Sequence, residues 1–115
     1  MELLALYIGA LLEGVVMIPI DPTKGKPDIG EILDEGKCDI IICNSKIFDE
    51  KINGKTIFHI EEIKSHFYEK NTTFNPQRIL QIDGEKCYAI TFTSGTSGKP
   101  KGVMHSFNNL YGAGR

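Results

Sequence analysis

Residues 87–103 read CYAITFTSGTSGKPKGV, and this stretch decides the fold that the sequence predicts. The part from Cys87 to Phe92 is apolar and rich in residues that favour strands, which predicts a buried β-strand. From Thr93 to Gly102 the chain becomes rich in glycine and hydroxyl side chains, which predicts a loop. In open α/β folds, ligands bind where such a loop leaves the carboxyl end of a strand.

The segments on either side of this stretch alternate between helical and strand patterns. Leucine and isoleucine recur at helical spacing from Leu3 to Leu12, with Gly14 as the predicted cap, and a helix of this composition is expected to be covered on most sides. Val15–Ile20 is continuously apolar, which is typical of a strand buried on both faces. Further elements are predicted as a turn at Asp21–Lys26, a helix from Pro27 to Gly36, strands at Asp39–Cys43 and Thr56–Ile60, a helix at Glu61–Tyr68, a loop at Asn71–Gln77, and a helix capped by Ser106 that follows the 93–102 loop.

This order of elements predicts an α/β fold with a mainly parallel sheet and flanking helices. The first and last predicted strands are expected to be neighbours in that sheet, with faces and edges that further elements would cover. Exposed strand edges and apolar faces favour aggregation, so we expect the isolated 115-residue chain to be poorly soluble.

Composition excludes several classes of function. The net charge of -2 provides no basic field for nucleic acid or an anionic membrane. The apolar N-terminal segment has no basic residue before it, is interrupted by Glu2 and Glu13, and is divided by Gly14 and Pro19. It therefore resembles neither a signal peptide nor a membrane span, and no integral membrane segment is expected.

The three cysteines do not form a recognisable framework. Their number is odd and no Cys-x-x-Cys pair is present, so we expect no disulfide set and a reducing, cytoplasmic location. A metal site built from Cys38, Cys43 and either His59 or His66 matches no zinc spacing. Buried or idle thiols explain these cysteines better, and we predict no metal ligand in the chain.

The 93–103 loop has the composition of a phosphate-binding loop. Glycines allow positive φ angles and close approach of the backbone to a ligand, and successive N–H groups in such a turn bind anions. Hydroxyl groups add donors, and two lysines add positive charge. The glycines are Gly95, Gly98 and Gly102, the hydroxyl residues are Thr93, Ser94, Thr96 and Ser97, and the cations are Lys99 and Lys101. This set indicates a phosphate, and more specifically a polyphosphate.

Two other interpretations compete with a specific phosphate loop. A flexible Gly/Ser/Thr linker explains the composition but not the position directly after a buried strand. A Walker A loop requires glycine at position 93 and a hydroxyl residue at position 100, where this chain has Thr93 and Pro100. The chain is therefore not an ordinary P-loop NTPase.

The loop Thr-Ser-Gly-Thr-Ser-Gly-Lys-Pro-Lys-Gly-Val resembles the signature of the adenylate-forming (AMP-binding) superfamily, which includes acyl-CoA synthetases, peptide-synthetase adenylation domains and luciferases. The segment from Gly9 to Pro22 is similar to an earlier motif of the same superfamily. The resemblance implies that residues 1–115 are part of the large N-terminal domain, truncated at both ends, with the phosphate-binding loop at 93–103.

The resemblance also implies an activity. Family members use ATP and Mg²⁺ to convert a carboxylic acid into an acyl-adenylate with release of pyrophosphate, and then transfer the acyl group to CoA or to a carrier protein. Lys101 matches a near-constant family lysine, whereas Lys99 stands at a variable position. The expected phosphate ligands are Thr93, Ser94, Gly95, Thr96, Ser97, Gly98, Lys99 and Lys101. Catalytic residues and Mg²⁺ ligands of the family are expected outside this chain.

Some residues depart from the pattern. Many members have a histidine where this chain has Phe107, and a histidine stands instead at His105. The sequence Val-Met-His-Ser at residues 103–106 is more similar to that of acyl-CoA synthetases. The leading prediction is therefore a segment of an acid–CoA ligase. An amino-acid adenylation domain and a non-catalytic remnant that at most binds nucleotide remain alternatives. We expect no ligase activity from the chain alone.

Overall fold

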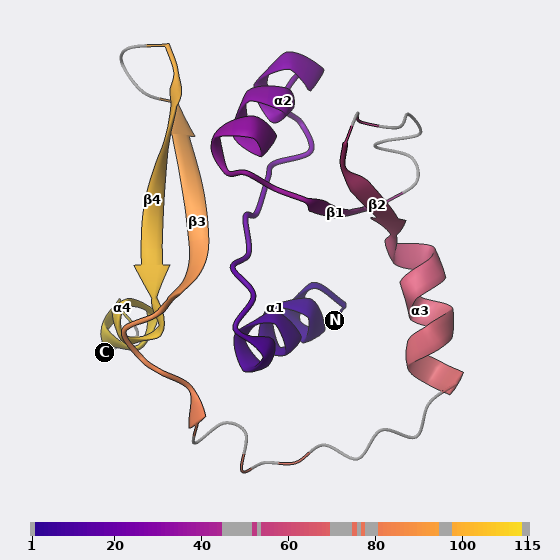
Figure 1. Ribbon diagram of the computed structural model, residues 1–115, viewed down its shortest axis with the longest axis vertical. Helices are drawn as coiled ribbons and strands as arrows, with labels where there is room; N and C mark the ends of the chain where they lie inside the picture. Colours follow the sequence, from indigo (N-terminus) through magenta and orange to yellow (C-terminus); the bar gives the residue numbers. More distant parts are fainter. Residues whose placement is uncertain are drawn as a thin grey trace.

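A computed structural model describes residues 2–44, 52, 54–69, 75, 77, 81–94 and 98–113. It confirms the α/β class, with helices and strands mixed along the chain (Figure 1). The elements are α1 (Glu2–Glu13), α2 (Lys26–Glu35), β1 (Ile40–Cys43), β2 (Thr56–His59), α3 (Ile60–Glu69), β3 (Cys87–Ser94), β4 (Pro100–Ser106) and α4 (Phe107–Ala113). The predicted loop at 71–77 lies outside the described residues, except for Asn75 and Gln77.

Helix α1 ends in the way that its sequence predicts. Gly14 adopts a φ of 68°, a left-handed conformation that favours glycine. Its N–H donates to Leu11 O at 3.3 Å, and the N–H of Val15 donates to Ala10 O at 2.8 Å. These two bonds form a Schellman motif, which satisfies carbonyl groups at the helix end and turns the chain toward β3.

The segment after α1 is less regular than predicted. Met17 forms a parallel bridge with Ala89, donating to Tyr88 O and accepting from Ile90 N, both at 2.9 Å. This confirms that the first predicted strand lies beside the strand of residues 87–94. The rest of Val15–Ile20 is not a strand, and Val15 and Val16 are exposed rather than buried on both faces. The segment has only one neighbouring strand among the described residues, so little of it is held in a ladder.

Strand β4 is the main difference from the prediction. The loop was predicted to run to Gly102 and no strand was predicted before the cap at Ser106, but residues 100–106 pair antiparallel with β3 to form a hairpin. Val103 is β-branched and favours a strand that returns along β3. Helix α4 follows only at Phe107, where Ser106 is the predicted cap. Ser106 Oγ accepts from Asn109 N at 3.3 Å, and Asn109 Oδ1 accepts from Ser106 N at 3.1 Å, which is a reciprocal capping arrangement.

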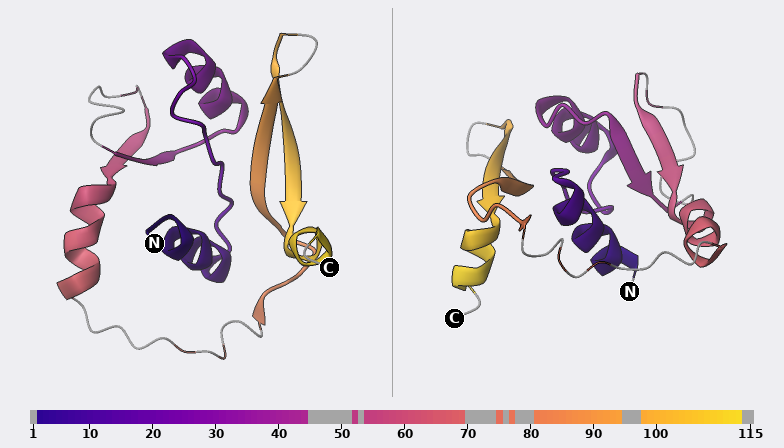
Figure 2. Two further views of the ribbon diagram at one scale, coloured as in Figure 1. Left: turned by 180° about the vertical axis from the view of Figure 1, so that it is seen from behind. Right: turned by 60° about the horizontal axis from the view of Figure 1, so that its bottom comes forward.

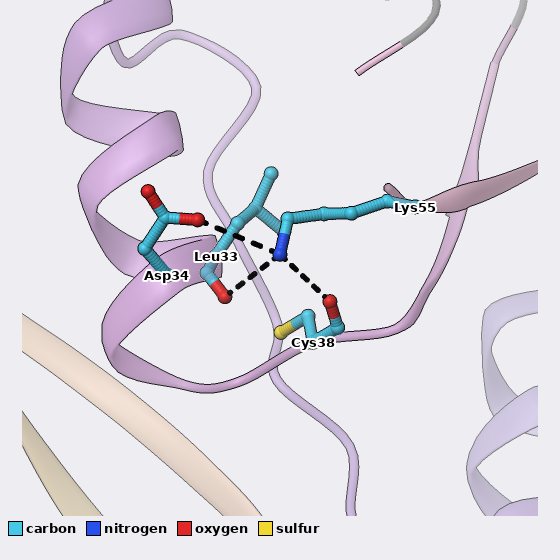
Figure 3. Close-up of polar contacts among 4 residues, drawn as sticks. All are labelled: Leu33, Asp34, Cys38 and Lys55. Carbon is cyan, nitrogen blue, oxygen red and sulfur yellow. Dashed lines mark hydrogen bonds and ion pairs between the residues drawn. The ribbon is translucent and has the colours of Figure 1, made fainter. Parts of the chain in front are cut away.

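Strands β1 and β2 form a second, parallel pair in which Ile42 is opposite Phe58 and Cys43 is opposite His59. Lys55, just before β2, joins this pair to the end of α2. Its Nζ atom lies 2.9 Å from Cys38 O and 3.5 Å from both Leu33 O and an oxygen of Asp34 (Figure 3). The hairpin and the β1–β2 pair lie on opposite sides of the molecule, with α1 and α2 between them (Figure 2).

The core is small and centred on α2. Its apolar stripe of Ile29, Ile32 and Leu33 is buried, together with Ala89 of β3. Gly36, at the end of α2, is packed so closely that an added Cβ would lie 2.5 Å from Cδ1 of Ile18. This close approach seats the end of α2 on the segment that pairs with β3.

The molecule is more open than a complete domain of its size. Its radius of gyration is 15.6 Å, whereas a compact domain of this length has about 13 Å. Leu3, Leu4 and Ile8 of α1 are exposed, so the prediction that this helix is covered on most sides is wrong for the chain as described. The described residues provide too few neighbouring elements to surround α1.

Candidate phosphate-binding site

The predicted phosphate loop is the tip of the β3–β4 hairpin. Ser94 is the last residue of β3 and pairs with Pro100, while Thr93 pairs with Lys101. The hairpin therefore brings Thr93, Ser94 and Lys101 to neighbouring positions on two strands. Three of the predicted ligands, Gly95, Thr96 and Ser97, lie outside the described residues.

The glycines around the tip have two different roles. Gly98 has a φ of 81°, which agrees with the expectation of a left-handed turn in the loop. Gly102 was expected to supply the same freedom, but it lies within β4 and its φ is not positive. The reason for glycine there is space, because an added Cβ would lie 3.0 Å from Ile90 Cγ2 and 3.3 Å from Cζ of Phe92. The Phe92 ring thus covers its cross-strand partner.

The charged and hydroxyl groups at the tip are accessible to an anion. Thr93, Lys99 and Lys101 are all exposed. Within the described part of the chain, neither lysine forms an ion pair. The Thr93 hydroxyl has one long contact, 3.5 Å to Lys101 O, which is weak for a hydrogen bond. These groups are therefore available to donate hydrogen bonds or provide positive charge to a phosphate.

A polar contact below the tip was not predicted. Thr91 Oγ1 and His105 Nε2 lie 2.7 Å apart across the hairpin, and both residues are half-buried. In the sequence, His105 stands out only as a departure from the family pattern. Strand β4 was not predicted, so nothing in the sequence indicated that His105 lies beside Thr91. The contact ties the two strands together diagonally below the Thr93–Lys101 pair, because Thr91 is opposite Val103 and His105 is opposite Ala89.

The turn at residues 21–24 follows the strand segment that runs beside β3. Asp21 Oδ1 accepts from Thr23 N at 2.9 Å and from Thr23 Oγ1 at 2.7 Å. The Thr23 N–H and then its hydroxyl lower the pKa of the Asp21 carboxyl below its usual range, because both bonds favour the ionised form. Met17 and Ala89 pair in parallel, so the chain runs in the same direction after each of them. The turn at residues 21–24 and the hairpin tip therefore lie at the same end of these two segments.

The described residues contain neither a metal-binding cluster nor a membrane-spanning helix. No group of three or more His, Cys, Asp and Glu side chains is placed to hold a metal ion. No helix among them has the length and apolar character needed to cross a membrane.

Comparison with known proteins gives the family. A sequence model of the family described as AMP-binding enzyme matches residues 1–114, nearly the whole chain. The chain belongs to the AMP-binding enzyme family. This membership confirms the resemblance that rested on the 93–103 loop and the segment from Gly9 to Pro22.

Relatives of this AMP-binding chain include carrier-protein ligases. It is 32% identical over 109 residues to the D-alanine–D-alanyl carrier protein ligase of Streptococcus pneumoniae (strain ATCC 700669 / Spain 23F-1). It is also 32% identical over 109 residues to the ligase of the same name from Streptococcus pyogenes serotype M5 (strain Manfredo). Both matches cover 95% of this chain but 20% of the relative, so the chain spans about a fifth of the length of these proteins.

Solved structures confirm the fold of the AMP-binding chain. A fatty acyl-adenylate ligase from L. pneumophila, in complex with acyl adenylate and pyrophosphate, matches with a TM-score of 0.70 at 23% identity. That match covers 98% of this chain and 20% of the other. McyG A-PCP complexed with phenylalanyl-adenylate matches with a TM-score of 0.65 at 17% identity, over 93% of this chain and 18% of the other.

Proposed function

We propose that the chain is the triphosphate-binding segment of a ligase that activates a carboxylic acid as an acyl-adenylate. The observation that carries the proposal is the hairpin tip, where the positive-φ turn at Gly98 is followed by the exposed Lys99 and Lys101, neither of which forms an ion pair with another described residue. A tip of this kind offers backbone N–H groups and positive charge to an anion. Family membership makes ATP the expected anion.

The proposed chemistry is positioning and charge neutralisation. ATP supplies the adenylyl group, and Mg²⁺ held by residues outside this chain assists it. Thr93, Ser94 and Lys101 would hold the β- and γ-phosphates, together with Lys99, the glycines Gly95 and Gly98, and the hydroxyl groups of Thr96 and Ser97. Neutralising these oxygens makes pyrophosphate a better leaving group when a carboxylate attacks the α-phosphorus.

Two acceptors for the activated acid are supported by different observations. The Val-Met-His-Ser sequence at residues 103–106 favours an acid–CoA ligase. The carrier-protein ligases at 32% identity favour an amino-acid substrate and a carrier protein instead. The three free cysteines suit a reducing compartment, so the proposal includes a cytoplasmic location.

Titration of the full 115-residue chain with sodium tripolyphosphate tests the phosphate site, with amide chemical shifts as the readout. We expect the largest shifts at Thr93, Ser94, Gly98 and Lys101. Lys101→Ala should weaken binding about tenfold, because it removes a charge-assisted contact. Lys86→Ala removes an exposed lysine before β3 and serves as the control. Equal weakening by both variants, or shifts remote from the tip, would argue for non-specific binding and against the proposed site.

A further inference from the structure

A hydrogen bond between two half-buried side chains lies below the phosphate-binding tip. Thr91 Oγ1 and His105 Nε2 are 2.7 Å apart, and the tautomer of the imidazole decides which of them donates. Side chains alternate between the two faces of a strand, so Thr91 lies on the same face of β3 as Thr93. For the same reason, His105 lies on the same face of β4 as Lys101. The hydrogen bond and the Thr93–Lys101 pair therefore share one face of the hairpin.

The register of the hairpin changes just below this hydrogen bond. The two consecutive pairs at that point are Cys87–Ser106 and Ala89–His105. The step between them is two residues on β3 but one residue on β4, which is a β-bulge. Above the bulge the register is continuous to the tip, where it places Thr93 opposite Lys101. The bulge therefore decides which residues of the two strands meet at the tip.

Without the bulge, the hairpin would bring different residues together at its tip. The register of the pair below the bulge, continued for five residues along each strand, places Phe92 rather than Thr93 opposite Lys101. A shift of one residue also exchanges the faces of one strand relative to the other. Thr91 and His105 would then lie on opposite faces and could not form their hydrogen bond. This bond is therefore lost in the shifted register and forms in the register that pairs Thr93 with Lys101.

We propose that His105 is a positioning residue for the phosphate-binding tip and acts through its hydrogen bond to Thr91. The bond favours the register in which Thr93 and Lys101 are partners over the one in which Lys101 is opposite Phe92. This inference rests on the proposed function, since it takes the tip to bind the phosphates of ATP. When only part of the population has the competent register, the apparent affinity falls by that fraction. His105 thus affects phosphate binding without contacting the ligand.

Substitutions at both ends of the hydrogen bond test this role in the 115-residue chain. Thr91→Val removes the hydroxyl group and keeps the branched shape, whereas His105→Leu removes the ring nitrogens. Each should weaken the binding of sodium tripolyphosphate about two- to tenfold, which is the range set by the net contribution of one hydrogen bond. The double variant should bind no more weakly than either single variant, because both changes remove the same bond. His105→Gln keeps a polar group of similar reach and should retain most of the affinity.

Nuclear Overhauser contacts report the register directly and need no ligand. In the wild-type chain we expect contacts between the backbone protons of Thr93 and Lys101. In Thr91→Val and in His105→Leu, a second set between Phe92 and Lys101 should appear. This second set should represent half or more of the molecules, as a twofold or larger loss of affinity requires.

Ile90→Val is the matched control. It removes one methyl group from a half-buried residue of β3 on the opposite face from Thr91, and its cost in stability is similar to that of a lost hydrogen bond. Well below its unfolding temperature this variant stays folded. Its tripolyphosphate affinity and its contacts between Thr93 and Lys101 should therefore equal those of the wild type.

Four outcomes would overturn the positioning role. Ile90→Val could weaken binding as much as Thr91→Val, or the effects of Thr91→Val and His105→Leu could add in the double variant. His105→Gln could bind as weakly as His105→Leu, or the contacts between Thr93 and Lys101 could persist undiminished in Thr91→Val. If the wild-type chain does not bind tripolyphosphate while both variants still change the register, the proposed function alone is removed.

Discussion

The ammonium group of Lys55 lies 2.9 Å from the carbonyl oxygen of Cys38, across the turn that joins α2 to β1 (Figure 3). A longer contact of 3.5 Å reaches Leu33 O in the last turn of α2. Leu33 O already accepts from Cys38 N at 3.0 Å, so Lys55 mainly satisfies Cys38 O, and its charge interacts favourably with the helix dipole. Lys55 therefore connects the end of α2 to the start of β2.

Replacing Lys55 by methionine should destabilise the chain by about 1–3 kcal/mol, because the side-chain volume is retained while Cys38 O loses the ammonium donor. Asp34→Asn should cost less than about 0.5 kcal/mol, since the Asp34 side chain is 81% exposed and surface ion pairs contribute little. Urea unfolding followed by circular dichroism measures both. Similar losses for the two variants would show that the ion pair, rather than the carbonyl contacts, is the stabilising interaction.

Two glycine substitutions should change the free energy of unfolding in opposite directions. Gly102→Ala places a methyl group 3.0 Å from Ile90 and 3.3 Å from the Phe92 ring, and should destabilise the hairpin by about 1–3 kcal/mol. Gly30→Ala lies within α2 with no atom within 4 Å of the new Cβ, and should stabilise the chain by about 0.5–1 kcal/mol. The same urea experiment serves for both. A neutral Gly102→Ala would mean that the Phe92 ring moves aside without cost.

Gly14→Ala tests the end of α1. The added Cβ meets nothing within 4 Å, so any effect comes from the φ of 68° and not from crowding. We expect a loss of about 1–2 kcal/mol, with Gly14→Asn retaining part of the stability because asparagine tolerates this conformation better. Helical circular dichroism during thermal unfolding reports the change. Equal stability of the alanine and asparagine variants would contradict a conformational cause.

Stability should decrease in alkaline solution. Desolvation raises the pKa of both thiols; for Cys38 the charge of Lys55 opposes this rise and Asp39 adds to it, and for Cys43 Glu61 adds to it. The folded chain therefore retains these protons at a pH where the unfolded chain releases them. The contribution to stability is complete below the unfolded thiol pKa of about 8.5 and is lost as pH rises toward the folded pKa. Desolvation, with a smaller effect of Tyr88, raises the pKa of Tyr7 and extends the same trend to higher pH.

Urea unfolding between pH 7 and pH 10 measures this slope. The Cys38→Ser/Cys43→Ser double variant cannot ionise at these positions, so its stability should vary less with pH than that of the wild type. The prediction is contradicted if the two proteins lose stability in parallel across this range.

Local patterns determine how far the fold could be predicted from sequence. The apolar stripe of Ile29, Ile32 and Leu33, the glycine at position 14 and the cap at Ser106 each act within a few residues, and all three predictions are confirmed. Strand β4 was missed because Gly102 was interpreted as a loop glycine. Glycine is needed at position 102 because the Phe92 ring lies against it across the hairpin, which is a tertiary contact.

The candidate site was predicted in composition but not in geometry. The family was recognisable mainly from the 93–103 loop, because its hydroxyl groups, glycines and lysines follow a long pattern, and the segment from Gly9 to Pro22 agreed with it. The sequence could not show that Thr93 and Lys101 face each other on two strands, or that Thr91 contacts His105 below them. These relationships follow from strand register, which one-dimensional periodicity does not specify when the turn is misplaced.

The bridge between Met17 and Ala89 has a consequence for how the chain folds. The two residues are 72 positions apart (89 minus 17), so this pairing closes a long loop and must await contacts that form more locally. At typical synthesis rates, Ala89 is made on the order of 4–14 s after Met17. During that interval the apolar segment from Val15 to Ile20 has no strand to join. The nascent chain is therefore expected to depend on chaperone binding at this segment until β3 leaves the ribosome.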